Sequence, residues 1–441
     1  MELTIEKLVY GGDGLARLEQ PDGKRKTVFV PLVLPGERVE ATVVEERPGF
    51  ARARLDRVLK ASPQRTGPAC PYFGECGGCH YQHAAYEEQL ALKREILRET
   101  VARIAKLELP EIGTHAADAL HYRNRTRLKF AVTAGAETKF EVGYHKLGSH
   151  LLLPVQKCPI SSPLINRALQ ALWTLAVEHD LPKGIAEIEL FVDHTDARLL
   201  VEFVVEANYD RSSAMSFAEE LQRNIPAVVG IAAVPRVNHG EEQVAAPELD
   251  TTVAACAETL WGRDYLEYKV GEFSYRVTAG SFFQTNRYLA EKLLELVCDD
   301  AHGKLAIDLY AGVGLFTLPL AKSFERVIAV EAAPASFTDL KSNAPRNVKA
   351  IQATTETYLS RGGARADLVV VDPPRAGLGK KALAGLTKLA PKSLLYVSCD
   401  PSTLARDLPG LANGGYRVTA AHLVDLFPQT FHIETVLRLE R

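Results

Sequence analysis

Hydrophobic and polar positions follow different patterns in the two ends of the chain. Over residues 1–60, short alternating runs are separated by turn residues such as Gly11-Gly12-Asp13-Gly14, which predicts a small β-barrel of roughly five strands, similar to oligonucleotide-binding (OB) folds. From about residue 264 onward, short apolar runs alternate with helical stretches. That alternation predicts an α/β domain with a doubly wound, mostly parallel sheet. Its expected strands are 305–309, 327–330, 368–371 and 394–397.

The middle of the chain has a mixed pattern, which predicts an α+β domain. We expect helices over 86–107 and 163–179, and strands over 187–192 and 199–205. The chain therefore divides into three expected domains: 1–60, 61–263 and 264–441.

One expected strand, from Tyr122 to Val132, has a basic residue at every second position. Because side chains alternate across a strand, one face would carry four positive charges. Such a face is either a phosphate-binding surface or the charged outer face of a sheet, and we favour the former. The four residues are Arg123, Arg125, Arg127 and Lys129.

Composition narrows the class of protein. The 441 residues are 46% hydrophobic and 24% charged, as in ordinary globular proteins. There is no basic flank before an apolar N-terminal segment and no apolar run of about 18 residues, so we predict a cytoplasmic protein without a membrane contact. Seven cysteines, an odd number, argue against a disulfide framework. The net charge of -3 means that any nucleic-acid contact must come from local basic surfaces.

A small-molecule site is indicated where the first parallel strands end. Asp308 and the pair Gly312-x-Gly314 follow the first strand, and Glu331 ends the next, where a carboxylate can accept hydrogen bonds from ribose hydroxyls. The third glycine of a dinucleotide fingerprint is missing, which disfavours a pyrophosphate cofactor. These features look like the S-adenosyl-L-methionine site of class I methyltransferases. Asp372, stiffened by the two prolines that follow it, is expected at the same edge.

A catalytic pair is expected further along the same edge. Cys399 follows a strand and precedes a helix, and a helix N-terminus lowers a thiol pKa, so we interpret Cys399 as a nucleophile. Glu434 begins the final apolar strand and is our choice for a general base, with His432 as the alternative. Cys256 and Cys298 are interpreted as buried apolar residues.

Four other cysteines have the spacing of a metal site. Cys70, Cys76 and Cys79 form a C-x5-C-x2-C cluster rich in glycine, and Cys158 could complete a four-thiolate set. An iron-sulfur cluster and zinc would both accept these ligands. His80 and His83 are weaker alternative ligands.

Five motifs in order along the chain resemble the bacterial RNA uracil-C5 methyltransferase family, and the resemblance covers nearly all of the sequence. The resemblance implies an N-terminal TRAM domain and transfer of a methyl group from S-adenosyl-L-methionine to C5 of a uridine. The motifs are Ser281-Phe-Phe-Gln, Asp308-Leu-Tyr-Ala-Gly-Val-Gly, Asp372-Pro-Pro-Arg-Ala-Gly, Ser398-Cys-Asp-Pro-Ser-Thr and Phe427-Pro-Gln-Thr-Phe-His-Ile-Glu.

The same resemblance implies roles for individual residues. Gln284, Tyr310, Glu331 and Asp372 would contact S-adenosyl-L-methionine. Cys399 would add to C6 of the uracil, which makes C5 reactive toward the methyl group, and Glu434 would then accept the C5 proton.

The cysteine cluster resembles the [4Fe-4S] site of the ribosomal-RNA branch of the family, which the simple tRNA branch lacks. This implies 23S ribosomal RNA as the substrate, with no obligate protein partner.

Three alternatives remain open. A tRNA uridine methyltransferase could retain the cluster. An amino-group methyltransferase could act through the Asp372-Pro-Pro turn with Cys399 only in the core, although Arg375 stands where such enzymes usually have an aromatic residue. The third is a non-catalytic RNA-binding module.

Overall fold

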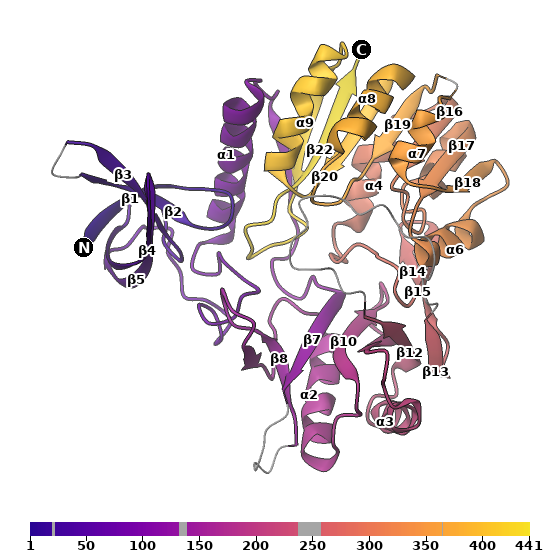
Figure 1. Ribbon diagram of the computed structural model, residues 1–441, viewed down its shortest axis with the longest axis horizontal. Helices are drawn as coiled ribbons and strands as arrows, with labels where there is room; N and C mark the ends of the chain where they lie inside the picture. Colours follow the sequence, from indigo (N-terminus) through magenta and orange to yellow (C-terminus); the bar gives the residue numbers. More distant parts are fainter. Residues whose placement is uncertain (20–22, 132–138, 237–256, 364) are drawn as a thin grey trace.

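The described residues form one closed barrel at the N-terminal end and three open sheets after it (Figure 1). The computed structural model describes residues 1–19, 23–131, 139–236, 257–363 and 365–441. No helix within these ranges is both long enough and apolar enough to cross a membrane. Cys256, which we interpreted as a buried apolar residue, lies outside them.

The N-terminal segment folds as the predicted barrel. Its strands close in the order β1-β2-β3-β5-β4. Alternate residues of β1 point inward, so that Leu3 and Ile5 are buried with Val28 and Val39 in a core that belongs to the barrel alone. The strands are β1 (Glu2–Leu8), β2 (Gly14–Glu19), β3 (Arg25–Val30), β4 (Arg38–Arg47) and β5 (Phe50–Lys60).

The segment after the barrel joins the C-terminal part of the molecule. Helix α1 (Tyr86–Ala105) buries Ile96, Leu97 and Val101 in the same apolar core as α9 (Pro401–Asn413). Strand β6 (Ile112–His115) then pairs in parallel with β21 (Arg417–Val424) at the edge of the C-terminal sheet. Residues 86–115 therefore belong structurally to the C-terminal unit, although they precede the central sheet in the sequence.

The central unit is a seven-stranded sheet in the order β13-β12-β11-β10-β7-β8-β9, covered on one face by two amphipathic helices. The predicted helix over 163–179 and the strands over 187–192 and 199–205 are confirmed. The elements are β7 (Arg125–Ala131), β8 (Glu141–His145), β9 (Leu152–Pro154), α2 (Pro163–Glu178), β10 (Ile185–Val192), β11 (Leu199–Val205), α3 (Arg211–Asn224), β12 (Val228–Pro235) and β13 (Glu258–Gly262).

The basic residues of β7 do not form a free cationic ridge. Arg125 pairs with Glu189 and Glu202, and its Nη2 lies 2.9 Å from Glu202 Oε1. Arg127 also pairs with Glu189. Lys129 pairs with Glu187 on the facing strand β10. Because glutamates offset these three charges, β7 fits the charged sheet face better than the phosphate-binding surface that we favoured.

A two-stranded hairpin leads into the C-terminal sheet, whose strand order is β18-β17-β16-β19-β20-β22-β21-β6. The first five strands are parallel, and β22 runs antiparallel to β20. The elements not yet named are β14 (Tyr265–Val270), β15 (Phe273–Thr278), α4 (Ala290–Cys298), β16 (Gly303–Leu309), α5 (Thr317–Ser323), β17 (Phe324–Glu331), α6 (Pro334–Asn343), β18 (Val348–Gln352), α7 (Thr355–Ser360), β19 (Leu368–Val371), α8 (Gly379–Leu389), β20 (Ser393–Ser398) and β22 (Glu434–Glu440).

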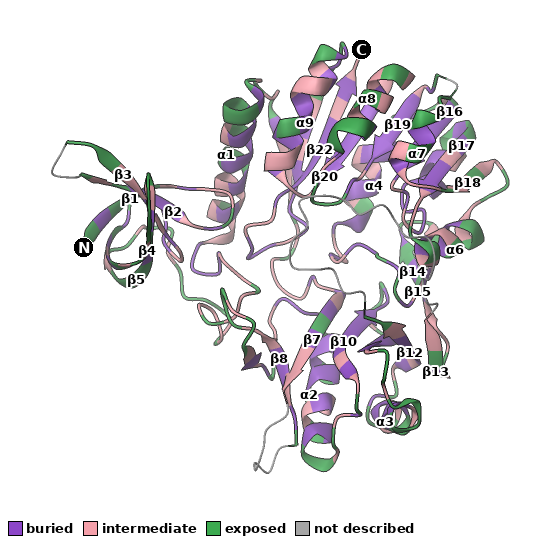
Figure 2. Cartoon of the chain, in the orientation of Figure 1, coloured by how far each residue is buried: buried purple, intermediate pink, exposed green. Residues whose placement is uncertain are grey.

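Both faces of the central strands β16, β19 and β20 are buried (Figure 2). In β19, Leu368 and Val370 join one apolar core while Val369 and Val371 join the other. This explains why the strand is a continuous apolar run in the sequence, as expected for a parallel sheet covered by helices on both sides. The predicted doubly wound α/β unit is confirmed.

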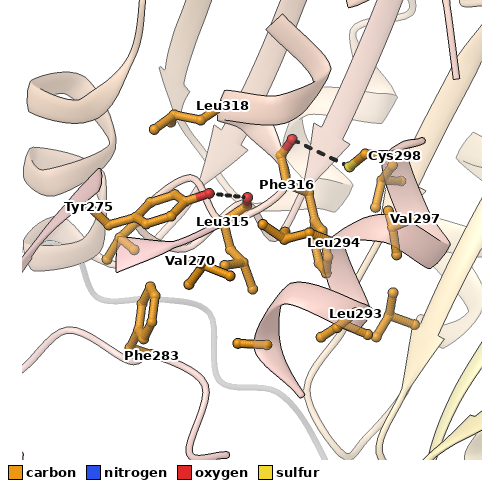
Figure 3. Close-up of a cluster of buried hydrophobic side chains, with 14 of the residues drawn as sticks. Val270, Tyr275, Phe283, Leu293, Leu294, Val297, Cys298, Leu315, Phe316 and Leu318 are labelled. Carbon is orange, nitrogen blue, oxygen red and sulfur yellow. Dashed lines mark hydrogen bonds between the residues drawn. The ribbon is translucent and has the colours of Figure 1, made fainter. Parts of the chain in front are cut away.

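Cys298 fills the first of these cores (Figure 3). The side chain is 5% exposed and packs among residues of α4 and the turn before α5, including Val297 and Phe316. Burial raises the pKa of its thiol well above the usual value. Our interpretation of Cys298 as an apolar filler is confirmed.

Candidate active site

Five of the predicted site residues lie at one edge of the C-terminal sheet. The last parallel pairings are Leu309 with Val371 and Val371 with Tyr396, so the residues that follow these strands emerge together. Strand β22 runs in the opposite direction beside β20, with Thr435 opposite Ser398. Cys399 directly follows Ser398, and Glu434 directly precedes Thr435, so Cys399 and Glu434 are neighbours at this edge. The five residues are Tyr310, Glu331, Asp372, Cys399 and Glu434.

The turn after β20 positions Cys399. Asp400 caps the following helix, and its Oδ1 accepts hydrogen bonds from the backbone N–H groups of Ser402 (2.8 Å) and Thr403 (3.1 Å). Pro401 occupies the first helical position, where its missing N–H costs no hydrogen bond. The strand therefore ends immediately before Cys399, and the helix begins within two residues after it.

The thiol of Cys399 has a raised pKa, contrary to our expectation. Burial raises it most, followed by the nearby carboxylates of Glu434 and Asp372, to about 12. The guanidinium of Arg375 acts in the opposite direction but does not offset them. Without RNA, this thiol is therefore protonated at neutral pH, because desolvation and two carboxylates outweigh the helix N-terminus.

Burial also disfavours the ionised form of Glu434. The residue is 4% exposed, and burial together with Asp372 raises the pKa of its carboxyl well above the usual value. Its pKa is closer to neutral pH than that of a solvated glutamate, so its carboxylate is a stronger base and better suited to accept a proton. The alternative base, His432, has a pKa lowered to about 3 by burial and by Arg375, whose Nη2 lies 3.4 Å from His432 Nδ1.

The backbone around the Gly-x-Gly turn is organised by Glu331. Its Oε2 accepts a hydrogen bond from Gly312 N (2.8 Å), and its Oε1 accepts one from Ala333 N (2.6 Å). Tyr310 adopts a left-handed conformation with φ 62°, which non-glycine residues rarely do. The region above Gly312 is open, because a Cβ atom there would meet nothing within 4 Å. A ligand can therefore approach this backbone closely.

Two neighbouring carboxyls, the buried Asp308 and the half-buried Asp372, lie at the same edge. Burial raises the pKa of Asp308 to about 7, with a further contribution from Glu331. Burial and Asp308 raise the pKa of Asp372 to about 7. Asp308 Oδ1 is buried without a hydrogen-bond partner among the described residues. This edge therefore combines acidic charge with unsatisfied acceptors, which favours a ligand that is cationic or rich in donors.

Gln284 lies on a loop that two units hold in place. Its backbone oxygen accepts a hydrogen bond from Asn124 Nδ2 at 3.0 Å. Upstream in the loop, Ser281 Oγ donates to Asp339 Oδ2 on α6 at 2.7 Å. Gln284 is 7% exposed. The loop thus lies between the start of β7 in the central sheet and α6 of the C-terminal unit.

The four clustered cysteines surround one small cavity. Cys70, Cys76, Cys79 and Cys158 line a space of about 30 Å³ together with Arg123 and aromatic residues. Cys76 Sγ accepts a hydrogen bond from Gly78 N at 3.4 Å. Within the described ranges, no three Cys, His, Asp or Glu side chains are close enough to hold a single metal ion. His83 is separated from this group, since its Nε2 faces Val33 O at 3.3 Å.

The sequence did not reveal how the segment before Glu434 is held. Gln429 is in the left-handed conformation, and its carbonyl oxygen accepts hydrogen bonds from His80 N (2.8 Å) and Tyr81 N (2.9 Å). Gln89 on α1 donates to its side chain at 3.0 Å. These partners lie more than 300 residues away in the chain, so no local pattern could have identified them.

Comparison with known proteins supports this description of the fold. Residues 85–441 match the family described as tRNA (Uracil-5-)-methyltransferase, and residues 1–55 match the TRAM domain. An RNA methyltransferase of Aquifex aeolicus, described as uncharacterized, is 35% identical over 448 residues, which cover 100% of this chain and 98% of that protein. A 23S rRNA (uracil(1939)-C(5))-methyltransferase of Chromohalobacter salexigens is 35% identical over 446 residues, covering 100% and 89%.

A solved structure has the same overall fold. The tRNA (uracil-54, C5)-methyltransferase of Pyrococcus abyssi, in complex with S-adenosyl-L-homocysteine, aligns with a TM-score of 0.72 and 23% identity over 100% of both chains. The family match covers the central and C-terminal units together, and the second match covers the barrel. This chain therefore belongs to the tRNA (uracil-5-)-methyltransferase family and carries a TRAM domain at its N-terminal end.

Proposed function

We propose that this protein methylates C5 of a uridine in 23S ribosomal RNA, with S-adenosyl-L-methionine as the methyl donor and Cys399 as a covalent nucleophile. The observation that carries the proposal is the proximity of Cys399, Glu434 and Asp372: Glu434 and Asp372 both raise the pKa of Cys399, and Asp372 raises the pKa of Glu434. A relative that is 35% identical over 100% of this chain is named as a 23S rRNA uracil-C5 methyltransferase, which supports the choice of RNA.

The proposed reaction uses the two groups in turn. The Cys399 sulfur forms a bond to C6 of the uracil, and the electron pair of the C5–C6 double bond moves toward O4. S-adenosyl-L-methionine supplies an electrophilic methyl group, and C5 takes it. Glu434 then accepts the C5 proton, the C6–S bond breaks, and the double bond is restored. Because the free thiol has a raised pKa, RNA binding must assist the loss of its proton, which passes to solvent before the sulfur attacks C6. After the C6–S bond breaks, the thiolate takes up a proton again and Glu434 releases the C5 proton to solvent.

We propose that Gln284, Tyr310, Glu331 and Asp372 hold the methyl donor. The raised pKa of Asp372 and Asp308 supports this, because a sulfonium cation nearby would stabilise their ionised forms. The open space above Gly312 supports a bound nucleoside at that turn. The target uridine would have to leave its stack to reach Cys399.

We further propose a [4Fe-4S] cluster bound by Cys70, Cys76, Cys79 and Cys158. All four line one cavity, a backbone N–H donates to Cys76 Sγ, and the Arg123 guanidinium lies beside them, as a negatively charged cluster would need. Zinc would accept the same four thiolates, and the resemblance of the cysteine spacing to the ribosomal-RNA branch of the family favours the iron-sulfur cluster. The methyl transfer requires no electron transfer, so we assign the cluster a structural role or a role in RNA docking.

Cys399→Ala tests the covalent mechanism. The wild-type protein should form an adduct with RNA that carries 5-fluorouridine, visible on a denaturing gel, because fluorine at C5 prevents the final elimination. Cys399→Ala should form no adduct and lose turnover by at least about a thousandfold. Retained turnover would refute the covalent mechanism and favour an amino-group methyltransferase.

The identity of the RNA has a separate test. The fold neighbour from Pyrococcus abyssi is named as a tRNA methyltransferase, so tRNA is the second candidate substrate. Mass mapping of ribosomal and transfer RNA from a deletion strain should show one lost methyl group in 23S RNA. Loss from the tRNA pool alone would contradict the assignment to ribosomal RNA.

A further inference from the structure

We infer that Tyr10, on the β1–β2 turn of the N-terminal barrel, is a positioning residue for the nucleophile Cys399, so that the barrel completes the active site in addition to any RNA contact it makes. This inference rests on the proposed function, since it assigns Tyr10 a role in the reaction of Cys399. It differs from that function in locating part of the machinery in a separate domain.

The contacts of Tyr10 lie on the catalytic segments. Its hydroxyl donates to the backbone oxygen of Cys399 at 3.4 Å. The Asp400 side chain, which caps α9, is a second acceptor for the same hydroxyl, whose one proton is shared between the two. Its ring meets Phe431 edge to face, with centroids 5.6 Å apart and planes at 88°. One side chain of the barrel thus touches both the residue proposed as nucleophile and the segment that leads to Glu434.

The turn that carries Tyr10 contains two glycines that allow close packing. The N–H of Val9 donates to Asp13 O at 2.9 Å, and Gly11 and Gly12 have φ values of 107° and 97°, which only glycine adopts readily. A Cβ atom at Gly12 would lie 3.3 Å from the Cβ of His80. The glycines therefore allow the turn to press against the cysteine-rich loop and to project Tyr10 toward the sheet edge.

The hydroxyl has a specific function at the end of β20. Ser398 is the last residue of that strand in the ladder with β22, so the Cys399 carbonyl lies beyond the sheet hydrogen bonds. The Tyr10 hydroxyl is the donor to this carbonyl among the described residues. It restrains the peptide group between Cys399 and Asp400, and therefore the direction of the thiol, while the bond that caps the helix restrains the other side.

A cavity beside Tyr10 lies where the barrel meets α1 and α9. A space of about 750 Å³ separates the barrel from α1 and from the start of α9, and Tyr10 and Ser402 both line it. Around this cavity the barrel also docks on α1, because Lys7 pairs with Glu99 and Leu8 is buried in the core that α1 and α9 share. Tyr10 differs from these docking contacts because its hydroxyl reaches the backbone of Cys399, which favours a positioning role.

Tyr10→Phe is the decisive variant, because it removes the hydroxyl and keeps the ring. Tyr416→Phe is the matched control, since the Tyr416 hydroxyl also donates to a backbone carbonyl, that of Pro391 at 2.8 Å, away from the site. For each variant we would measure the rate of adduct formation with 5-fluorouridine RNA, kcat for methyl transfer, the RNA Kd, and hydrogen exchange of residues 398–404.

Tyr10→Phe should slow adduct formation and kcat roughly three- to tenfold, as expected for one hydrogen bond. Its RNA Kd and Tm should match those of Tyr416→Phe, and hydrogen exchange should accelerate at 398–404 only in Tyr10→Phe. Tyr10→Ala, which also loses the contact with Phe431, should be slower still. A merely structural role would change the Tm or the Kd and leave kcat at saturating RNA unaltered.

Unchanged kcat in Tyr10→Phe would overturn the inference, whatever the exchange result. A weaker RNA Kd with normal kcat would also overturn it, because Tyr10 would then be an RNA contact. If the wild-type protein methylates RNA without an adduct, the covalent mechanism fails, while kcat and hydrogen exchange still decide the role of Tyr10.

Discussion

Lys93 and Asp425 form an ion pair in which both side chains are fully buried, with 2.6 Å between Nζ and Oδ1. Lys93 Nζ also donates to Phe427 O at 2.9 Å, and Tyr86 OH donates to Asp425 Oδ2 at 3.0 Å. The pair joins α1, which lies next to the barrel in the sequence, to the segment that precedes Glu434. A helix from the N-terminal half of the chain therefore fixes the start of the last strand of the catalytic sheet.

Lys93→Met should lower the free energy of unfolding by about 3–5 kcal/mol, because Asp425 would stay buried without its counter-ion. Urea unfolding would measure the change. Arg98→Met on the same helix is the control: its pair with Glu95 is exposed to solvent, so its loss should cost less than about 1 kcal/mol. Equal effects of the two substitutions would contradict the structural importance of the buried pair.

Glu434→Gln should separate the two halves of the proposed reaction. The amide keeps the shape of the side chain but cannot accept the C5 proton, so a covalent RNA complex should accumulate with ordinary uridine. Turnover should fall by roughly 10²–10⁴. Glu440→Gln, at the opposite end of the same strand, should leave turnover unaltered. If Glu434→Gln turned over normally and trapped no complex, His432 would become the candidate base.

Alkylation of Cys399 should depend steeply on pH in the absence of RNA. Since burial and the neighbouring carboxylates raise the pKa of this thiol to about 12, its rate of reaction with iodoacetamide should rise about tenfold per pH unit from about pH 7 to about pH 9.5. Mass spectrometry of the Cys399 peptide would follow it. Arg375→Gln should slow the reaction further, because Arg375 lowers this pKa. A rate that is independent of pH would show that the thiolate is already formed.

Asp308 should make the protein less stable as the pH rises. Burial raises its pKa from 3.8 in the unfolded chain to about 7, so the stability from its protonated form is present below about pH 4 and is lost as the pH rises to about 7. Asp308→Asn should therefore reduce the fall in Tm between about pH 5 and about pH 8.

The control for this experiment is Asp367→Asn. A hydrogen bond from Lys392 lowers the pKa of Asp367 to about 2, so its contribution is present above about pH 4 and is lost only as the pH falls below that. This variant should leave the difference in Tm between about pH 5 and about pH 8 unaltered. The same difference in Asp308→Asn and in the wild-type protein would contradict a raised pKa at Asp308.

Removal of one cysteine should abolish the proposed cluster. Protein purified without oxygen should contain about four iron and four sulfide ions per chain, and Cys79→Ser should lose most of both together with the visible absorbance. Cys298→Ala should retain them, since Cys298 lies in the apolar core of the C-terminal unit. Stoichiometric zinc in the wild-type protein, with no iron, would contradict the assignment.

Much of the fold was predictable because its determinants are local. The alternation of β1 and the continuous apolar run of β19 record which faces of those strands are buried. The position of Cys399 between a strand and a helix, and of Glu331 at the end of β17, follows from the same periodicity. Side chains on one face repeat every two residues in a strand and every 3.6 residues in a helix, so the buried face is visible in the nearby sequence.

Other properties depended on residues that are distant in the chain. The sequence suggested a basic ridge at Arg125, but glutamates from β10 and β11 pair with its charge. A helix N-terminus predicted a reactive thiolate at Cys399, but burial and two carboxylates raise its pKa. In both cases the sequence identified the local group correctly, but the residues that interact with it come from other strands or follow them.

The sequence by itself determined the type of each element, the order of the units and the residue types at the sheet edge, because these follow from periodicity and from short motifs. Only the tertiary structure decided that α1 and β6 complete the C-terminal unit, that Gln429 is held by residues of the cysteine-rich loop, and that Tyr10 of the barrel contacts Cys399. Electrostatic and hydrogen-bond energies depend on distance in space, and folding brings together residues whose separation in the chain conveys nothing about that distance.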